Sequence, residues 1–210
     1  MDPTQKCLQF SRFVATCVFV ILERLPHQQE DAQRRVATQQ MLEKATLFIY
    51  RVLKTTSNAI SMSVVVLALK FVQRLKEVGT QPVSFGAEAY LFLVSLMSAQ
   101  KVTADNCYTA HSWGKIANVP AEIISRMECE FLQSIQYQLF VSDAEFGSWL
   151  IYVQYLAKNF DHSRQSPMQS PPLSINDSIK LPRRSSVQYP VQSFHVPRRC
   201  SSSSLPIRAI

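Results

Sequence analysis

The chain has 210 residues, of which 47% are hydrophobic and 18% are charged, enough for one substantial core. Its formal net charge of +7 is unevenly spread. Residues 1–161 hold 15 Lys and Arg against 14 Asp and Glu, whereas residues 162–210 hold 7 against 1. The nearly neutral first part argues against a basic nucleic-acid groove in the core. Only four glycines, together with long apolar runs, favour helices over a turn-rich β fold.

The apolar stretch at residues 13–22 is the one candidate for a targeting segment. It is ten residues long and is closed by Glu23 and Arg24, so it is too short to span a bilayer. No convincing small-residue cleavage site follows it. We therefore interpret it as an amphipathic helix that packs on the core.

From residue 27 to residue 78 the chain contains neither Pro nor Gly, and apolar residues recur with helical spacing. This pattern predicts helices at about 36–56 and 61–77. Residues 86–100 are apolar on nearly every side, which is typical of a central helix wrapped by others. Ser84 is predicted to cap the start of that helix.

The next segments continue the helical pattern. A short helix is predicted at about 109–117, and Pro120 opens another that is predicted to run to about residue 140. Ser142 and Glu145 form a capping box that starts a last helix. The expected architecture is all-α, with five helices around one apolar third helix and an additional helix at each end.

Proline placement predicts the domain limits, because seven of the eleven prolines follow residue 161. We expect an N-terminal helical extension at 1–35 and a domain with its following helix at 36–161. Residues 162–210 are rich in Ser, Pro and Arg and poor in clustered apolar residues, so we expect a disordered tail.

Catalytic and metal-binding motifs are missing from the sequence. It has no G-x-S-x-G elbow, H-E-x-x-H pair, P-loop or Gly-rich dinucleotide turn. Cys107 and His111 are four residues apart, but two ligands do not make a metal site. Five scattered cysteines without C-x-x-C fit a reducing compartment, so we expect an intracellular protein. We predict no catalytic residue, metal or cofactor, and a protein that works by presenting a surface.

Residues 91–150 carry a dense series of short patterns. An apolar helix ends in Lys101 and is followed by D-N-x-Y, S-W-x-K-I, R-M-E-x-E-F-L and L-x-V-S-x-x-E-F. Together these patterns resemble the cyclin box, and they look most like the fungal phosphate-pathway cyclins, the PHO or PCL type. Weaker helical agreement extends back to about residue 40.

This resemblance implies a five-helix cyclin box with its hydrophobic third helix at the centre, in line with the helical pattern. It also implies a regulatory subunit that binds and activates a cyclin-dependent serine/threonine kinase and helps to direct it to substrates. In cyclins, the lysine that ends the third helix and a glutamate of the fifth grip the kinase. The corresponding residues here are Lys101 and Glu128. Without the resemblance, Lys101 would be a helix C-terminal charge and Glu128 a solvated helix residue.

The chain also departs from the wider family. The substrate-docking motif of mitotic cyclins is absent from the first box helix, and no second box fits after residue 161. Two alternatives are a cyclin-fold transcription or nucleic-acid adaptor and a scaffold that no longer activates a kinase. The near-neutral core argues against the first, and the intact Lys101 and Glu128 argue against the second. Phosphate signalling, morphogenesis and G1 progression of the cell cycle stay open as pathways, and so do nucleus and cytoplasm as locations.

The tail contains candidate phosphorylation sites. Ser166 and Ser170 each precede a proline, as proline-directed kinases require, and Ser185 and Ser186 follow two arginines, as basophilic kinases prefer. Phosphorylation at these positions would sharply reduce the local positive charge.

Overall fold

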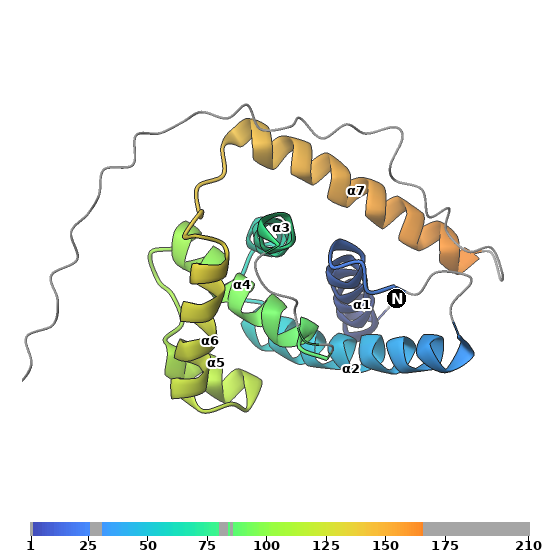
Figure 1. Ribbon diagram of the computed structural model, residues 1–210, viewed down its shortest axis with the longest axis horizontal. Coiled ribbons are helices and arrows are strands. Elements are labelled where there is room, and N and C mark those ends of the chain that lie inside the picture. The colour runs from blue at the N-terminus through green and yellow to red at the C-terminus, as the bar shows by residue number, and fades with distance from the viewer. Residues whose placement is uncertain (1, 26–30, 80–83, 85, 166–210) are drawn as a thin grey trace, which may run out of the picture. The chain divides into compact units, whose positions relative to one another are not determined.

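The structure is a computed structural model that describes residues 2–25, 31–79, 84 and 86–165, with the backbone alone from residue 161. All regular secondary structure in these residues is helical, which confirms the all-α class (Figure 1). The helices are α1 (Pro3–Ile21), α2 (Ala32–Thr56), α3 (Met62–Val78), α4 (Glu88–Thr103), α5 (Ala110–Ala117), α6 (Ala121–Ser134) and α7 (Asp143–Gln165).

The predicted helices all exist, although several of their limits differ from the prediction. Helix α2 begins four residues before the predicted position, and α7 continues to Gln165, past the expected domain limit at residue 161. The limits of the extension, domain and tail stay predictions. The expected disorder of the tail, and the sites Ser166, Ser170, Ser185 and Ser186, lie outside the described residues.

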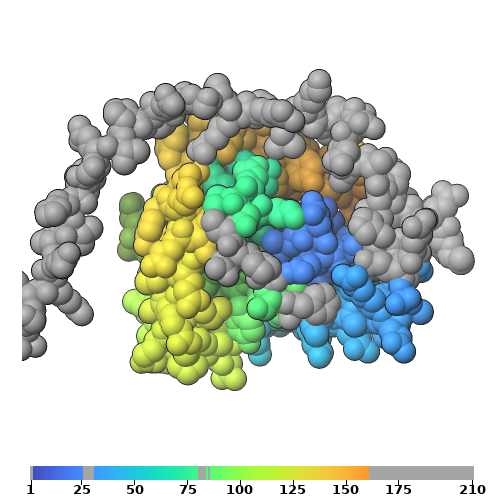
Figure 2. Space-filling model, in the orientation of Figure 1, coloured from blue at the N-terminus to red at the C-terminus, as the bar shows by residue number. Residues whose placement is uncertain are grey.

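Helix α4 occupies the centre of the core, as its sequence predicts. Eleven of its sixteen residues are buried, and Phe92, Leu93, Leu96 and Met97 are fully so. Helices α1, α2, α3 and α6 all pack against it. In the space-filling view, α6 (yellow) borders α3 (green) on the face shown (Figure 2).

The predicted N-cap of this helix is wrong. Helix α4 begins at Glu88, and the N-cap is Ala87, not Ser84. The Glu88 carboxylate instead reaches back to accept a hydrogen bond of 2.8 Å from the backbone N–H of Gly86. Gly86 has φ +97°, a backbone conformation that suits glycine, and this turn brings its N–H to the carboxylate.

Helix α1 confirms the interpretation of the N-terminal apolar stretch. Its buried side includes Val14, Ala15, Val18 and Phe19, and it packs mainly against α2. Burial raises the pKa of the Cys17 thiol on the same side to about 12, so this thiol stays protonated at neutral pH. None of the described helices is long and apolar enough to cross a membrane.

Helix α6 ends earlier than its apolar pattern predicts. It stops at Ser134 instead of continuing to residue 140, and Pro120 is its N-cap instead of lying in its first turn. Gln136 and Tyr137 both have positive φ, which turns the chain out of the helix. We call the connection from α6 to α7, residues 135–142, the strap.

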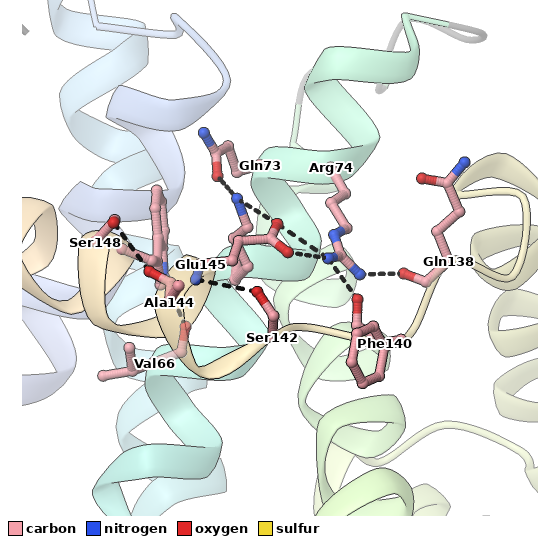
Figure 3. Close-up of polar contacts among 11 residues, drawn as sticks. Val66, Gln73, Arg74, Gln138, Phe140, Ser142, Ala144, Glu145 and Ser148 are labelled. Atoms are coloured by element: carbon pink, nitrogen blue, oxygen red, sulfur yellow. Dashed lines mark hydrogen bonds and ion pairs between the residues drawn. The ribbon is translucent and has the colours of Figure 1, made fainter. Parts of the chain in front are cut away.

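Two buried cations of α3 hold the strap and the start of α7 (Figure 3). The Arg74 guanidinium donates to the backbone carbonyls of Gln138 and Phe140, the latter at 2.7 Å, and to both Glu145 carboxylate oxygens at 3.0 Å. Lys70 Nζ lies 3.1 Å from Glu145 Oε1. We call this group of contacts the Arg74 latch. It joins α3 to the strap and the start of α7, which lie 64 to 71 positions after Arg74 in the sequence. The sequence analysis missed it.

Glu145 therefore has two roles at the start of α7, one through its backbone and one through its side chain. Its backbone N–H donates to Ser142 Oγ at 3.2 Å, which confirms the first half of the predicted capping box. Its side chain does not return to the N-cap, because Arg74 and Lys70 take both carboxylate oxygens. Partial burial raises the pKa of Glu145, but the hydrogen bonds from Arg74 and Lys70 outweigh burial and lower it overall.

A second anchor fastens α7 to α3. The Trp149 indole is buried, and its Nε1–H donates to the backbone carbonyl of Val66 at 2.9 Å. Lys70 Nζ lies 5.4 Å from the centre of the same indole ring, within reach of a cation–π interaction. The first two turns of α7 are thus fixed to α3 by one charged and one aromatic side chain.

The lowered pKa of Glu145 predicts a pH dependence of the free energy of unfolding. Ionised Glu145 stabilises the fold above the pKa of an unfolded glutamate, about 4.3. This contribution is lost as the pH falls through the lower pKa of the folded state. We expect Glu145→Gln to lower the free energy of unfolding by about 1 kcal/mol at pH 7 and by less as the pH falls toward 3.

Urea denaturation followed by circular dichroism between pH 7 and 3 measures this difference. Glu130→Gln is the matched control, because Glu130 is exposed and pairs only loosely, at 3.9 Å, with Arg126. A destabilisation by Glu145→Gln that stays constant over this pH range would contradict the role of the ionised carboxylate.

Candidate functional site

The structure brings together the two residues that the sequence analysis selected for kinase contact. Lys101 lies in the last turn of α4, and Glu128 lies in the middle of α6, 27 positions later. The Lys101 Nζ donates to Oε1 of Glu128 at 2.6 Å and to Oε2 at 2.8 Å. Both carboxylate oxygens are thus engaged by one ammonium group, which is the geometry of a strong, charge-assisted pair.

The position of Glu128 follows from the face of α6 that meets the core. Ile124, one turn before it, and Phe131, about one turn after it, are buried. The Glu128 side chain between them is only 11% exposed. The alternative of a solvated helix residue is therefore wrong for Glu128, because its helical position turns it toward the interior.

Lys101 marks the point where α4 leaves the core. Met97, Ala99 and Gln100 are buried, whereas the Lys101 side chain is 46% exposed and Val102 is exposed. Its place in the last helical turn also favours a cation, because the carbonyl end of a helix is negative. The negative end of the helix dipole and the Glu128 carboxylate therefore both attract this ammonium group.

The ammonium group keeps capacity for a further partner. A lysine ammonium has three N–H donors, and Lys101 makes two contacts, both to Glu128. No other described residue forms a hydrogen bond or an ion pair with Lys101. The pair thus presents a half-exposed donor whose direction is held by a largely buried carboxylate.

The polar loop after α4 is tied back to the end of that helix. The buried Gln100 side chain accepts a hydrogen bond of 3.3 Å from the Tyr108 N–H through Oε1. The Cys107 thiol donates to the Ala104 carbonyl at 3.0 Å, and the Tyr108 ring meets the Trp113 ring edge-on at 5.5 Å. These contacts fix the loop beside Lys101, although it contains no regular structure.

Cys107 and His111, which the sequence analysis considered as metal ligands, have no third candidate ligand among the described residues. Among the residues that the structure describes, no group of three or more His, Cys, Asp or Glu side chains could hold a metal ion. The thiol of Cys107 is engaged with backbone carbonyls of Gln100 and Ala104. Its contacts are those of a loop-forming residue.

Comparison with known proteins bears on this arrangement. Residues 36–139 match the family model for the cyclin domain. The G1/S-specific cyclin pas1 of Schizosaccharomyces pombe is 26% identical over 114 residues, in an alignment that covers 51% of this chain and 27% of that protein. The chain thus spans about a quarter of the length of this curated relative. No solved structure matches the chain.

The described residues form an all-helical domain with a preformed ion pair at its surface. They contain no group of side chains that could hold a metal ion. The matched range contains both Lys101 and Glu128 and covers most of α2 and all of α3 to α6. Residues 36–139 are similar to the cyclin domain, and the two comparisons support the cyclin family for this chain. The PHO or PCL type stays a prediction.

The burial of Glu128 predicts that the pair is energetically coupled. Lys101→Met keeps the apolar stem but leaves a largely buried carboxylate without its donor, and we expect a loss of about 1–3 kcal/mol in the free energy of unfolding. In a Glu128→Gln background, the same substitution should cost about 1 kcal/mol less, because no charge is then stranded.

A double-mutant cycle by urea denaturation measures this coupling. The Arg126–Glu130 pair supplies a matched control on the same helix, since its side chains are 66% and 67% exposed and its coupling should be about 0–0.5 kcal/mol. Equal coupling in the two cycles would show that Lys101–Glu128 behaves as an ordinary surface pair.

Proposed function

We propose that this chain is a regulatory cyclin subunit that binds and activates a cyclin-dependent serine/threonine kinase and helps to direct it to substrates. The observation that carries the proposal is the preformed Lys101–Glu128 pair at the junction of α4 and α6. It lies within the residues that match the cyclin domain. Members of this family are regulatory proteins and not enzymes themselves.

The geometry of the pair suits the end of a kinase helix. The last carbonyl groups of an α-helix have no partner within that helix. A half-exposed lysine ammonium can donate its remaining N–H to one of them, in a hydrogen bond that is strengthened by its charge. Glu128 then acts mainly by orienting Lys101, because the interaction forms with a side chain that is already held.

The contribution to activity would be conformational. A cyclin that binds the inward position of the kinase regulatory helix more tightly than its outward position shifts the kinase toward the active state. In that state the Lys–Glu pair and the metal-binding Asp of the kinase are aligned for phosphoryl transfer. All catalytic groups in this scheme belong to the kinase.

We further propose a cyclin of the PHO or PCL type, with a partner kinase of the class that those cyclins bind. The patterns in residues 91–150 support this subtype. Under this proposal the protein acts in the nucleus, the cytoplasm or both, in phosphate signalling or in the cell cycle. The serines at positions 166, 170, 185 and 186 would serve as regulatory phosphorylation sites.

Co-purification of the full chain with fungal cyclin-dependent kinases tests the proposal. We expect the wild-type chain to bring down a kinase that phosphorylates a peptide substrate. Lys101→Glu with Glu128→Lys keeps an ion pair but reverses its polarity, so an acidic group would face the kinase carbonyls. We expect this double variant to lose at least about tenfold in affinity.

The matched control reverses Arg126 and Glu130, which form an exposed pair on α6. Helical circular dichroism must show that each variant is folded. Equal kinase binding by the wild type and the Lys101–Glu128 variant would remove the assigned site. Failure of the wild type to bind any of the kinases would favour the adaptor or scaffold function instead.

A further inference from the structure

The strap displays the most exposed large hydrophobic side chain in the described part of the molecule. Phe140 is 84% exposed, and Tyr137 in the same segment is 61% exposed. Their neighbours Leu139 and Val141 are partly buried and pack against the core. The strap therefore has an inner side that belongs to the fold and an outer side with two aromatic rings that the fold does not use.

The backbone that carries these rings is held firmly. Buried Arg74 donates to the carbonyls of Gln138 and Phe140 (Figure 3). The Tyr137 N–H donates to the Leu132 carbonyl at 2.8 Å, and the Leu139 N–H donates to the Tyr137 carbonyl at 2.9 Å. An exposed aromatic ring on a fixed backbone loses little conformational entropy when a partner covers it, which is typical of an interface anchor.

The strap is continuous with the face of α6 that carries Glu128. Leu132 lies one helical turn after Glu128 and is half-buried. The backbone of Tyr137 folds back onto Leu132 through the hydrogen bond described above. The strap thus begins two helical turns after Glu128 and folds back onto the next turn of the same helix.

We propose that Phe140 is an apolar anchor for the same kinase that the Lys101–Glu128 pair engages, and that Arg74 is the residue that positions it. This inference rests on the proposed function and names a further contact of that site. Phe140 inserts into an apolar depression of the kinase, while the ammonium of Lys101 satisfies a helix end. The charged contact gives orientation, and the aromatic contact adds affinity by removing apolar surface from water.

Phe140→Ala in the full chain tests the anchor. Because the ring contributes little to the core, we expect the urea midpoint to stay unchanged while the Kd for the kinase rises by about 10- to 100-fold. Phe140→Leu should retain part of the affinity. Ile151→Ala on α7 is the matched control, since Ile151 is 69% exposed and lies outside the strap, and its Kd should equal that of the wild type.

Arg74→Gln tests the positioning role. This variant should be less stable and should bind the kinase more weakly. If Arg74 acts through Phe140, its effect on the Kd shrinks in the Phe140→Ala background, whereas its effect on the urea midpoint is the same in both backgrounds. A merely structural arginine would give the same loss of kinase affinity in the two backgrounds.

The outcomes separate this inference from the proposed function. If Phe140→Ala binds as tightly as the wild type while the Lys101–Glu128 reversal does not, the anchor is wrong and the proposed function stands. If the wild type binds no kinase, both are wrong. If the wild type sediments as a dimer that Phe140→Ala dissociates without a change in kinase affinity, the aromatic face belongs to a second copy and the inference is overturned.

Discussion

The burial of α4 is the constraint on which the remaining structure depends. This helix has no polar side along most of its length, so other helices must cover it in every direction. Residues 92–100 of this helix are all buried, and the helix reaches solvent in its last turn at Lys101. Helix α6, which packs across α4, brings Glu128 to that same point. The candidate site is therefore a consequence of how the core is closed.

Two clusters of charge in this protein have different physical characters. In the Arg74 latch, a buried guanidinium is satisfied by two backbone carbonyls and a carboxylate that also binds Lys70. Such saturation offsets the cost of removing a charge from water and leaves little capacity for a partner. The Lys101 ammonium, by contrast, is half-exposed and bonded to one carboxylate. The first cluster holds the fold together, and the second is available for recognition.

Much of the fold could be predicted from the sequence because the apolar pattern has a clear helical period. The central position of residues 86–100 and the packing of the N-terminal stretch were both readable from apolar residues alone. The end of α6 was not, since Ile135 and Leu139 continue the apolar spacing although Gln136 and Tyr137 leave the helix. Local spacing does not report a positive φ at residues other than glycine.

The candidate site and the Arg74 latch differ in how far the sequence predicts them. Lys101 and Glu128 were found through their resemblance to cyclins, and their contact was then visible only in three dimensions. Lys70 and Arg74 were missed because two cations on a helix normally indicate a solvated face. A signal existed: they lie four residues apart within the mostly apolar stretch 64–75 of α3, and Glu145 supplies an acid further along the chain. Without the fold, nothing in the sequence joins that acid to α3.

The most direct measurement is a structure of this chain bound to the cyclin-dependent kinase that we propose as its partner. The account predicts that Lys101 keeps its contact with Glu128 and donates to a backbone carbonyl of the kinase regulatory helix. It also predicts that the ring of Phe140 is covered by the kinase. A complex in which both Lys101 and Phe140 remain exposed to solvent, with the kinase on another face, would contradict it.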